Sequence, residues 1–414
     1  MAELAINGGS PVRQEPYPVW PVWDKNELDA VAAVIGSGKW GMSGGGRVLE
    51  LQEKFAAYQD AAYGIACTSG TTALRTALIA AGLEAGAEVI VPAYTFVASA
   101  TAVLEANMVP IFADIDPDTY TLDPPSVERA ITDRTKAIMP VHIAGLPCDM
   151  EAINGIAEKH DLVVVEDACQ AWGSEFRGRK AGAIGDLGAF SFQSSKHITA
   201  GEGGMIVTND EALAAACTSL VNCGRTPEGA WHEHHLLGGN YRLSELQAAV
   251  ILAQLARYEQ MLARRQESAA YLRAALGEIE GIDPLVVPDY VSASSYHLFI
   301  IRYEPEAFGG LPKDKFVKAL NTEGIMPAHG GYFIPVYRQP VLLEKNVQPF
   351  DRILSHTYRD KVIDYADFDC PITELACSEQ ALWLLQNLLL ADRGGLDQIV
   401  EAFHKLSRCY GELI

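Results

Sequence analysis

Short apolar runs alternate with longer stretches of helical periodicity between residues 64 and about 208. Each run is apolar at nearly every position, which is typical of strands that helices cover on both faces. A helical stretch follows the first run, and another follows the second and ends near Ala106. This alternation predicts a doubly wound α/β domain with a parallel sheet. The predicted strands are residues 64–68, 88–92, 109–115, 136–141 and 162–167.

The pattern changes in the second half of the chain. Residues 188–193 and 203–210 predict a closing pair of strands, and a long helical pattern then runs from Ser244 to about Leu276. We expect this helix to link the first domain to a second one.

The C-terminal third has weaker periodicity. A β run at 296–303 and a helical stretch at 313–324 predict a smaller α+β domain. We therefore divide the chain into a large domain, residues 1–255 with an N-terminal arm, and a small C-terminal domain, residues 256–414.

Composition narrows the function classes. The chain has 414 residues, of which 49% are hydrophobic and 21% charged, so we expect a folded protein with several cores. Its net charge of −21 argues against nucleic-acid binding, because phosphate backbones attract basic surfaces. No uninterrupted apolar run of about 18 residues predicts a membrane span, and the first residues do not resemble a signal peptide. The eight cysteines form no CxxC pair, so we expect free thiols and a cytoplasmic location.

The candidate chemistry lies at the ends of the predicted strands, where open α/β sheets bind their ligands. Residues 68–72, Thr-Ser-Gly-Thr-Thr, lead from a strand into a helix. Gly70 lets the backbone approach a ligand, the amides of the helix start point outward, and Thr71 adds a hydroxyl donor. The segment predicts a phosphate cradle, and plain helix capping is the alternative.

Three further strand ends carry suitable groups. Tyr94 and Phe96 follow the second strand, where they could stack on a flat ring or pack in the core. Asp167 ends a hydrophobic strand, where it could hold a ring nitrogen protonated or cap a helix. Lys196 precedes a glycine-rich turn, and a deprotonated lysine forms imines with carbonyls, although a lone lysine is usually solvated. Together these groups match the needs of pyridoxal phosphate.

The chain resembles the sugar and cyclitol aminotransferases of the DegT/DnrJ/EryC1/StrS family, within fold-type I of the pyridoxal-phosphate enzymes. The resemblance covers nearly the whole chain. The opening GGSPVR and the TAGEGG element are most similar to the branch that contains inosose aminotransferases and aminohydroxybenzoate synthase. It implies a large domain with a mostly parallel seven-stranded sheet and a smaller C-terminal domain. Its motifs are TSGTTAL at 68–74, PAYTF at 92–96, VEDACQAWG at 165–173, GDLGAFSFQSSK at 185–196, TAGEGG at 199–204 and GNYRLSELQAA at 239–249.

The resemblance also implies roles for individual residues. Lys196 would bind the cofactor covalently and shuttle the proton, Asp167 would pair with the pyridine nitrogen, and Gln170 would lie near the ring hydroxyl. Phe96, or less favourably Tyr94, would stack on the ring. Asn240 would reach the phosphate of the neighbouring subunit, so we expect a homodimer with shared active sites. The phosphate would be held by Gly70, Thr71 and Ser191.

The implied function is an aminotransferase of aminosugar or aminocyclitol biosynthesis. It would move an amino group from L-glutamine or L-glutamate to a keto-sugar or keto-cyclitol, by a ping-pong mechanism through pyridoxamine phosphate. Some relatives replace the lysine by histidine, but the register of SFQSSK places Lys196, not His197, at that position. The alternatives are a pyridoxal-phosphate-dependent dehydratase or aromatase on the same fold and, more remotely, a non-catalytic cofactor-binding regulator.

The acceptor pocket is less well marked. A Gly/Pro loop that simply packs on its domain is the alternative for residues 329–338, and a flexible turn is the alternative for Trp40. The histidines of 231–235 are spaced too closely for a usual zinc site, so we expect a loop over the site and no metal. The candidate acceptor residues are Trp40, Tyr94, His329, Tyr332, Tyr337 and Arg338.

Overall fold

The computed structural model describes residues 3–226, 229–344 and 363–414. A seven-stranded sheet of order β1-β9-β8-β5-β4-β2-β3 forms its larger part, and this confirms the predicted mostly parallel sheet. Only β9 runs against its neighbours, β1 and β8, so the predicted closing pair of strands, β8 and β9, is antiparallel. The strands are β1 Tyr63–Cys67, β2 Glu88–Pro92, β3 Val109–Ala113, β4 Thr135–Ile138, β5 Val163–Asp167, β8 Leu187–Ser191 and β9 Gly204–Thr208.

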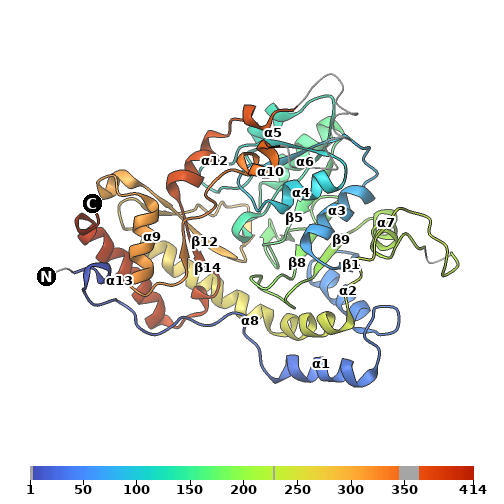
Figure 1. Cartoon of the computed structure of the whole chain (residues 1–414), viewed down its shortest axis with the longest axis horizontal. Coiled ribbons are helices and arrows are strands. Elements are labelled where there is room, and N and C mark those ends of the chain that lie inside the picture. Colours follow the sequence, from blue (N-terminus) through green and yellow to red (C-terminus); the bar gives the residue numbers. More distant parts are fainter. Residues whose placement is uncertain (1–2, 227–228, 345–362) are drawn as a thin grey trace.

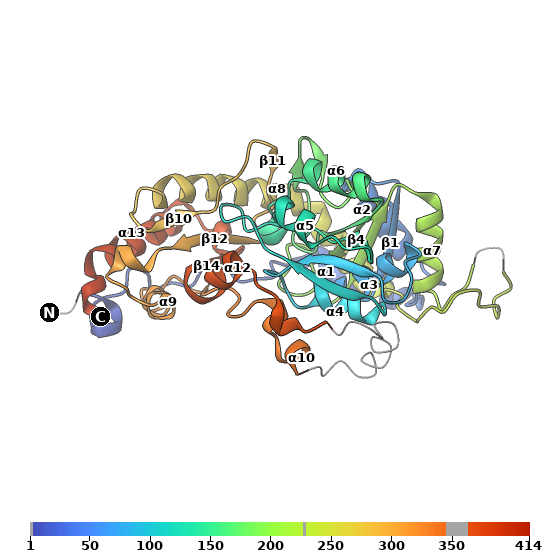
Figure 2. The same ribbon diagram turned by 90° about the horizontal axis from the view of Figure 1, so that it is seen from above.

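Helices cover both faces of this sheet, which explains why its strands are apolar throughout (Figures 1 and 2). Along β2, Val89 and Val91 enter the core shared with α3, α4 and α7, whereas Ile90 points into the opposite core beneath α5 and α6. The two cores thus follow from the alternation of side chains along a strand. The helices of this part are α1 Lys25–Ser37, α2 Arg47–Tyr58, α3 Gly70–Ala80, α4 Ala98–Glu105, α5 Pro124–Ala130, α6 Met150–His160 and α7 Glu211–Val221.

The long helix α8, Glu245–Leu276, connects the two parts of the molecule (Figure 1). A capping box fixes its start, because Ser244 accepts from the Gln247 N–H while Gln247 reaches back to the Ser244 N–H. Its first half packs in the core beside β8 and β9, and its second half packs in the core of the smaller part. The predicted boundary at residue 255 therefore falls inside a continuous helix.

The smaller part contains an antiparallel sheet of order β10-β12-β14-β13. Its core also takes Leu4 and Tyr17, so the N-terminal arm packs here although the predicted division assigned it to residues 1–255. A third small sheet has the order β11-β6-β7. The remaining strands are β6 Glu175–Phe176, β7 Arg179–Lys180, β10 Ile282–Pro284, β11 Val291–Ala293, β12 Leu298–Tyr303, β13 Ala328–His329 and β14 Ala381–Leu385. The remaining helices are α9 Lys313–Thr322, α10 Pro340–Leu343, α12 Pro371–Leu375 and α13 Arg393–Cys409. Within the described ranges, none of the helices has the length and apolar character needed to cross a bilayer.

Candidate functional site

A cavity of about 750 Å³ opens at the carboxyl ends of the large sheet's strands. One wall comes from the ends of β5 and β8 and the start of α3, and the other from the smaller part and the N-terminal arm. The structure brings seven of the eight predicted cofactor residues to this one cavity. They are Gly70, Thr71, Phe96, Asp167, Gln170, Ser191 and Lys196.

The start of α3 forms a tight cradle. Ser69 caps the helix by accepting from the Thr72 N–H at 3.1 Å, which leaves other amides of the first turn directed outward. A Cβ on Gly70 would lie only 2.7 Å from Ser191 Cβ and 2.9 Å from Cys169 Sγ. Only glycine fits this position, and an anion above it would meet backbone N–H groups at the positive end of a helix. The predicted phosphate cradle and the helix cap are therefore one structure.

Asp167 presents its carboxylate to the cavity. It ends β5 and is 6% exposed. Its Oδ2 accepts from Ser99 Oγ at 2.7 Å and its Oδ1 from the Cys169 N–H at 3.2 Å, and together these bonds fix the orientation of the carboxylate. No regular helix begins here, so the carboxylate caps a turn and can still pair with a protonated ring nitrogen.

Lys196 lies in the turn after β8, where its N–H donates to the carbonyl of Gln193 at 2.9 Å. Burial lowers the pKa of its amine, and the nearby Cys169 and Asp167 oppose that shift. Among the described residues its Nζ has no hydrogen-bond partner, so the amine is free to react with a carbonyl.

The aromatic residues after β2 divide between cavity and core. Phe96 lines the cavity and is 58% exposed, so its ring face is open to a ligand. Tyr94 is buried and does not line the cavity, because its hydroxyl accepts from Trp383 Nε1 at 3.0 Å and its ring packs edge-on against Tyr332. Tyr94 thus supports two cavity residues, Tyr332 and Trp383, from behind. The amide of Gln170 is held from the other side, since its Oε1 accepts from the Ala144 N–H at 2.7 Å.

Of the six predicted acceptor residues, only Tyr332 lines this cavity. Tyr337 is fully buried and donates to Glu374 Oε1 at 2.8 Å. Arg338 pairs with the same carboxylate at 3.0 Å, so its charge is already satisfied away from the cavity. Trp40 is exposed and does not line the cavity, and its indole N–H donates to the carbonyl of Ile35.

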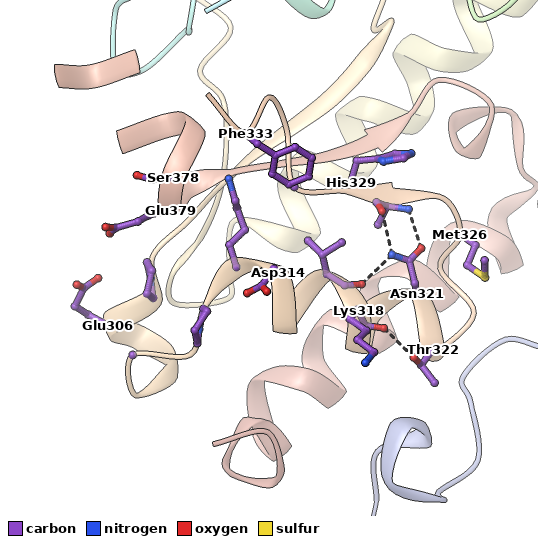
Figure 3. A pocket seen from close by; sticks show the side chains of 17 residues that line it. Glu306, Asp314, Lys318, Asn321, Thr322, Met326, His329, Phe333, Ser378 and Glu379 are labelled. Carbon is purple, nitrogen blue, oxygen red and sulfur yellow. Dashed lines mark hydrogen bonds between the residues drawn. The ribbon is translucent and has the colours of Figure 1, made fainter. Parts of the chain in front are cut away.

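His329 lines a second cavity, of about 1000 Å³, between α9 and β13 (Figure 3). Phe333 and Asn321 share its walls, so residues 329–333 separate this cavity from the first. Asn240 is exposed and bridges Asn222 outside both cavities. Within the described ranges, no group of three or more histidine, cysteine or acidic side chains is placed to hold a metal ion.

Sequence reasoning missed the wall that the smaller part supplies. Trp20 comes from the N-terminal arm, His297 precedes β12, and Trp383 and Gln386 lie within and after β14. The polar pair that ends the apolar strand, Gln386 with Asn387, was a usable signal. Like the predicted cofactor residues, Gln386 and Asn387 directly follow an apolar strand and line the cavity.

Comparison with known proteins gives a consistent result. The model of the DegT/DnrJ/EryC1/StrS aminotransferase family matches residues 21–364. An L-glutamine:2-deoxy-scyllo-inosose aminotransferase of Streptoalloteichus tenebrarius is 37% identical, with 99% of both chains covered. The Micromonospora echinospora protein of the same name is 35% identical over 100% of both chains.

Two solved structures extend the comparison. The crystal structure of 3-amino-5-hydroxybenzoic acid synthase has a TM-score of 0.84 at 32% identity, and the match covers 96% of this chain and 100% of that one. The structure of NtdA from Bacillus subtilis with bound cofactor PMP has a TM-score of 0.81 at 27% identity, covering 96% of this chain and 87% of that one.

Proposed function

Since the chain belongs to the DegT/DnrJ/EryC1/StrS aminotransferase family, whose enzymes depend on pyridoxal phosphate, we propose that it transfers the amino group of L-glutamine to a keto-cyclitol of the scyllo-inosose type. The observation that carries the proposal is the gathering of an anion cradle, a hydrogen-bonded carboxylate, an open aromatic face and a free amine in one cavity.

The residues present fit the cofactor. Gly70, Thr71 and Ser191 would hold the phosphate in a cradle that any added Cβ would fill. Asp167 would hold the ring nitrogen, and Phe96 would cover the ring. Gln170 would lie near the ring hydroxyl, with its side chain held between the Ala144 N–H and the Tyr332 hydroxyl. When bound, pyridoxal phosphate supplies an electron sink and stores the amino group between the two halves of the reaction.

The chain's own groups would carry the protons. Burial lowers the pKa of Lys196, so its Nζ gives up a proton more readily and can take one from the α-carbon of the donor. In the second half the same Nζ would return a proton to the carbon that was the ketone. Asp167, held in position by Ser99 and the Cys169 N–H, would keep a proton on the ring nitrogen throughout.

The charge of the cavity favours a free cyclitol over a nucleotide-linked sugar. Of the cavity-lining residues that the structure describes, Lys196 is the only lysine or arginine. A diphosphate needs cationic partners, and the amine of Lys196 is reserved for the cofactor. Relatives named for 2-deoxy-scyllo-inosose, similar along their whole length, support the same choice.

We also propose a homodimer in which Asn240 reaches the phosphate of the neighbouring subunit. Asn240 is exposed, and so are the nearby apolar side chains of Trp231 and Leu237, the latter to 96%. Such a patch is typical of a surface that a partner covers. The cytoplasmic location stays a proposal, in keeping with eight free cysteines.

The first experiment is an absorbance spectrum of the protein with pyridoxal phosphate, before and after L-glutamine is added without an acceptor. We expect the band of the lysine-bound cofactor to convert to that of pyridoxamine phosphate, and 2-deoxy-scyllo-inosose to reverse the change. Lys196→Ala should abolish both spectral events while the fold persists. Asp167→Asn should weaken cofactor binding and slow the conversion.

A band that neither glutamine nor glutamate changes would contradict the proposal. It would favour the dehydratase or aromatase alternative, which the likeness to 3-amino-5-hydroxybenzoic acid synthase keeps in view. Normal turnover in Lys196→Ala would refute the lysine assignment.

A further inference from the structure

A buried cation without a counter-charge lies behind the small-domain wall of the cavity. Arg265, on α8, is 0% exposed. Burial lowers the pKa of its guanidinium to about 10, so it remains charged at neutral pH. Among the described residues no carboxylate pairs with it, and its second terminal nitrogen (NH1) is buried without a hydrogen-bond partner. A buried charge of this kind is costly unless an anion completes its surroundings.

The ionisable groups around Arg265 do not offset its charge. His197 and His297 pack near it, and burial lowers the pKa of both imidazoles well below the usual range, so both are neutral. Burial raises the pKa of Tyr258, which therefore stays protonated. The guanidinium lies over the ring of Trp20 at 5.3 Å, and this ring and His297 both line the cavity. None of these three neighbours supplies a negative charge to Arg265.

Gln386 transmits this charge to the cavity surface. It follows β14 and lines the cavity, and its Oε1 accepts from Arg265 Nε at 3.0 Å and also from a terminal nitrogen (NH2) of the same guanidinium. Because a guanidinium only donates, the carbonyl of the amide must face Arg265. The amide nitrogen then faces away, and no acceptor among the described residues takes it. The wall presents a fixed N–H donor, polarised by the cation behind it.

We propose that Gln386, oriented by Arg265, binds the α-carboxylate of the amino donor. The inference rests on the proposed function, since it presumes an amino-acid donor. A carboxylate supplies both the acceptor that the Gln386 amide lacks and the negative charge that Arg265 lacks. A polyol acceptor would supply only the first. Gln386 is the binding residue here, and Arg265 is a positioning residue that acts through it.

The test uses two unreactive pieces of glutamine. Glutaramate keeps the carboxylate and lacks the amino group, whereas butanamide lacks both. Calorimetric titration of the holoenzyme measures their binding without any turnover. In Gln386→Glu the new carboxylate pairs with Arg265, so the fold is retained while the donor and the net positive charge are lost. We expect glutaramate to bind about tenfold or more weakly, as the loss of a charge-assisted hydrogen bond predicts, and butanamide to bind as before.

Two further variants make the result specific. Gln266→Glu adds the same charge one residue from Arg265 but outside the cavity, where Gln266 donates to the carbonyl of Ser294, and it should bind glutaramate normally. Gln386→Met keeps the uncompensated charge of Arg265 and removes only the amide N–H donor. Its loss of glutaramate affinity should therefore be smaller than that of Gln386→Glu.

Three outcomes would overturn the assignment: unchanged glutaramate binding in Gln386→Glu, equal losses for both ligands, or an equal loss in Gln266→Glu. Each is distinguishable from failure of the proposed function, in which the unaltered enzyme itself takes no amino group from glutamine.

Discussion

Two adjacent carboxylates at the end of β5 should respond differently when each is replaced by its amide: one replacement should destabilise the fold, and the other should weaken cofactor binding. Glu166 and Asp167 point to opposite faces of the sheet. Glu166 is fully buried, and each of its oxygens accepts two hydrogen bonds. His142 Nε2 and the Gly182 N–H reach Oε2 at 2.8 and 2.7 Å, and the N–H groups of Ile184 and Gly185 reach Oε1 at 2.7 and 2.6 Å. We predict that Glu166→Gln destabilises the fold.

The magnitude follows from counting donors. An amide nitrogen in place of either oxygen confronts two donors and leaves both unsatisfied, so flipping the amide gives no relief. His142 cannot become an acceptor at Nε2, because its Nδ1 already accepts from the Cys148 N–H at 3.1 Å. Each buried unsatisfied donor costs about 1–3 kcal/mol, so we expect a loss of about 2–6 kcal/mol in the free energy of unfolding.

Asp167→Asn should cost the fold less than about 1 kcal/mol. An amide oxygen can still accept from the Cys169 N–H, and the Ser99 hydroxyl can rotate to accept from the amide nitrogen. Its effect should fall on cofactor affinity instead. Denaturant unfolding of both variants without cofactor, followed by a cofactor titration, separates the two effects. If Glu166→Gln unfolds like the unaltered protein, or if Asp167→Asn is the less stable of the two, the reasoning is refuted.

Three further outcomes follow from the same geometry. Gly70→Ala should lower the free energy of unfolding by about 1–3 kcal/mol and weaken phosphate binding, because its Cβ would lie 2.7 Å from Ser191 Cβ. The control is Gly155→Ala on α6, where an added Cβ meets open space and should leave the free energy of unfolding unchanged. A destabilised control would count against the steric explanation. Ser99→Ala removes the 2.7 Å bond to Asp167 and should raise the dissociation constant of the cofactor several-fold in an absorbance titration, so an unchanged constant would contradict the role of that bond. Burial alone would raise the pKa of Glu166, but hydrogen bonds from His142 and the backbone lower it. The stability that the ionised Glu166 adds to the fold is therefore present above the unfolded pKa of about 4.3 and is lost as the pH falls through the lower, folded pKa. Unfolding midpoints that do not change as the pH falls below about 4.3 would refute this.

The cavity wall that carries the predicted cofactor residues could be predicted from the sequence because its geometry is local. Parallel strands end at one edge, so Asp167, at the end of β5, and Ser191, at the end of β8, had to lie close together. Gly70 joined them because a helix begins directly after β1. Continuous apolar runs predicted the buried strands for the same reason, since a strand covered on both faces has no polar face.

The opposite wall depends on tertiary packing that no local pattern encodes. Arg338 follows a Gly/Pro-rich stretch that suggested a pocket, but Glu374, 36 positions later, pairs with it elsewhere. Tyr94 sits at a strand end like Phe96, yet Trp383 and Tyr332 cover it. A partner so distant along the chain decides whether a polar or aromatic side chain faces a ligand or a core.

Helix α8 contacts elements of both parts of the molecule and positions side chains on each side of the cavity. At its first turn Glu245 accepts from the N–H groups of Gly46 and Val48, which ties the helix to the start of α2. Five turns later Arg265 holds Gln386 against the cavity. Under the proposed function, the large-domain wall would meet the needs of one constant cofactor, whereas the small-domain wall would meet the changing substrates. Differences in donor and acceptor choice among enzymes of this fold should therefore trace to side chains on the wall that α8 positions, and substitutions there should alter substrate affinity while the cofactor spectrum stays the same.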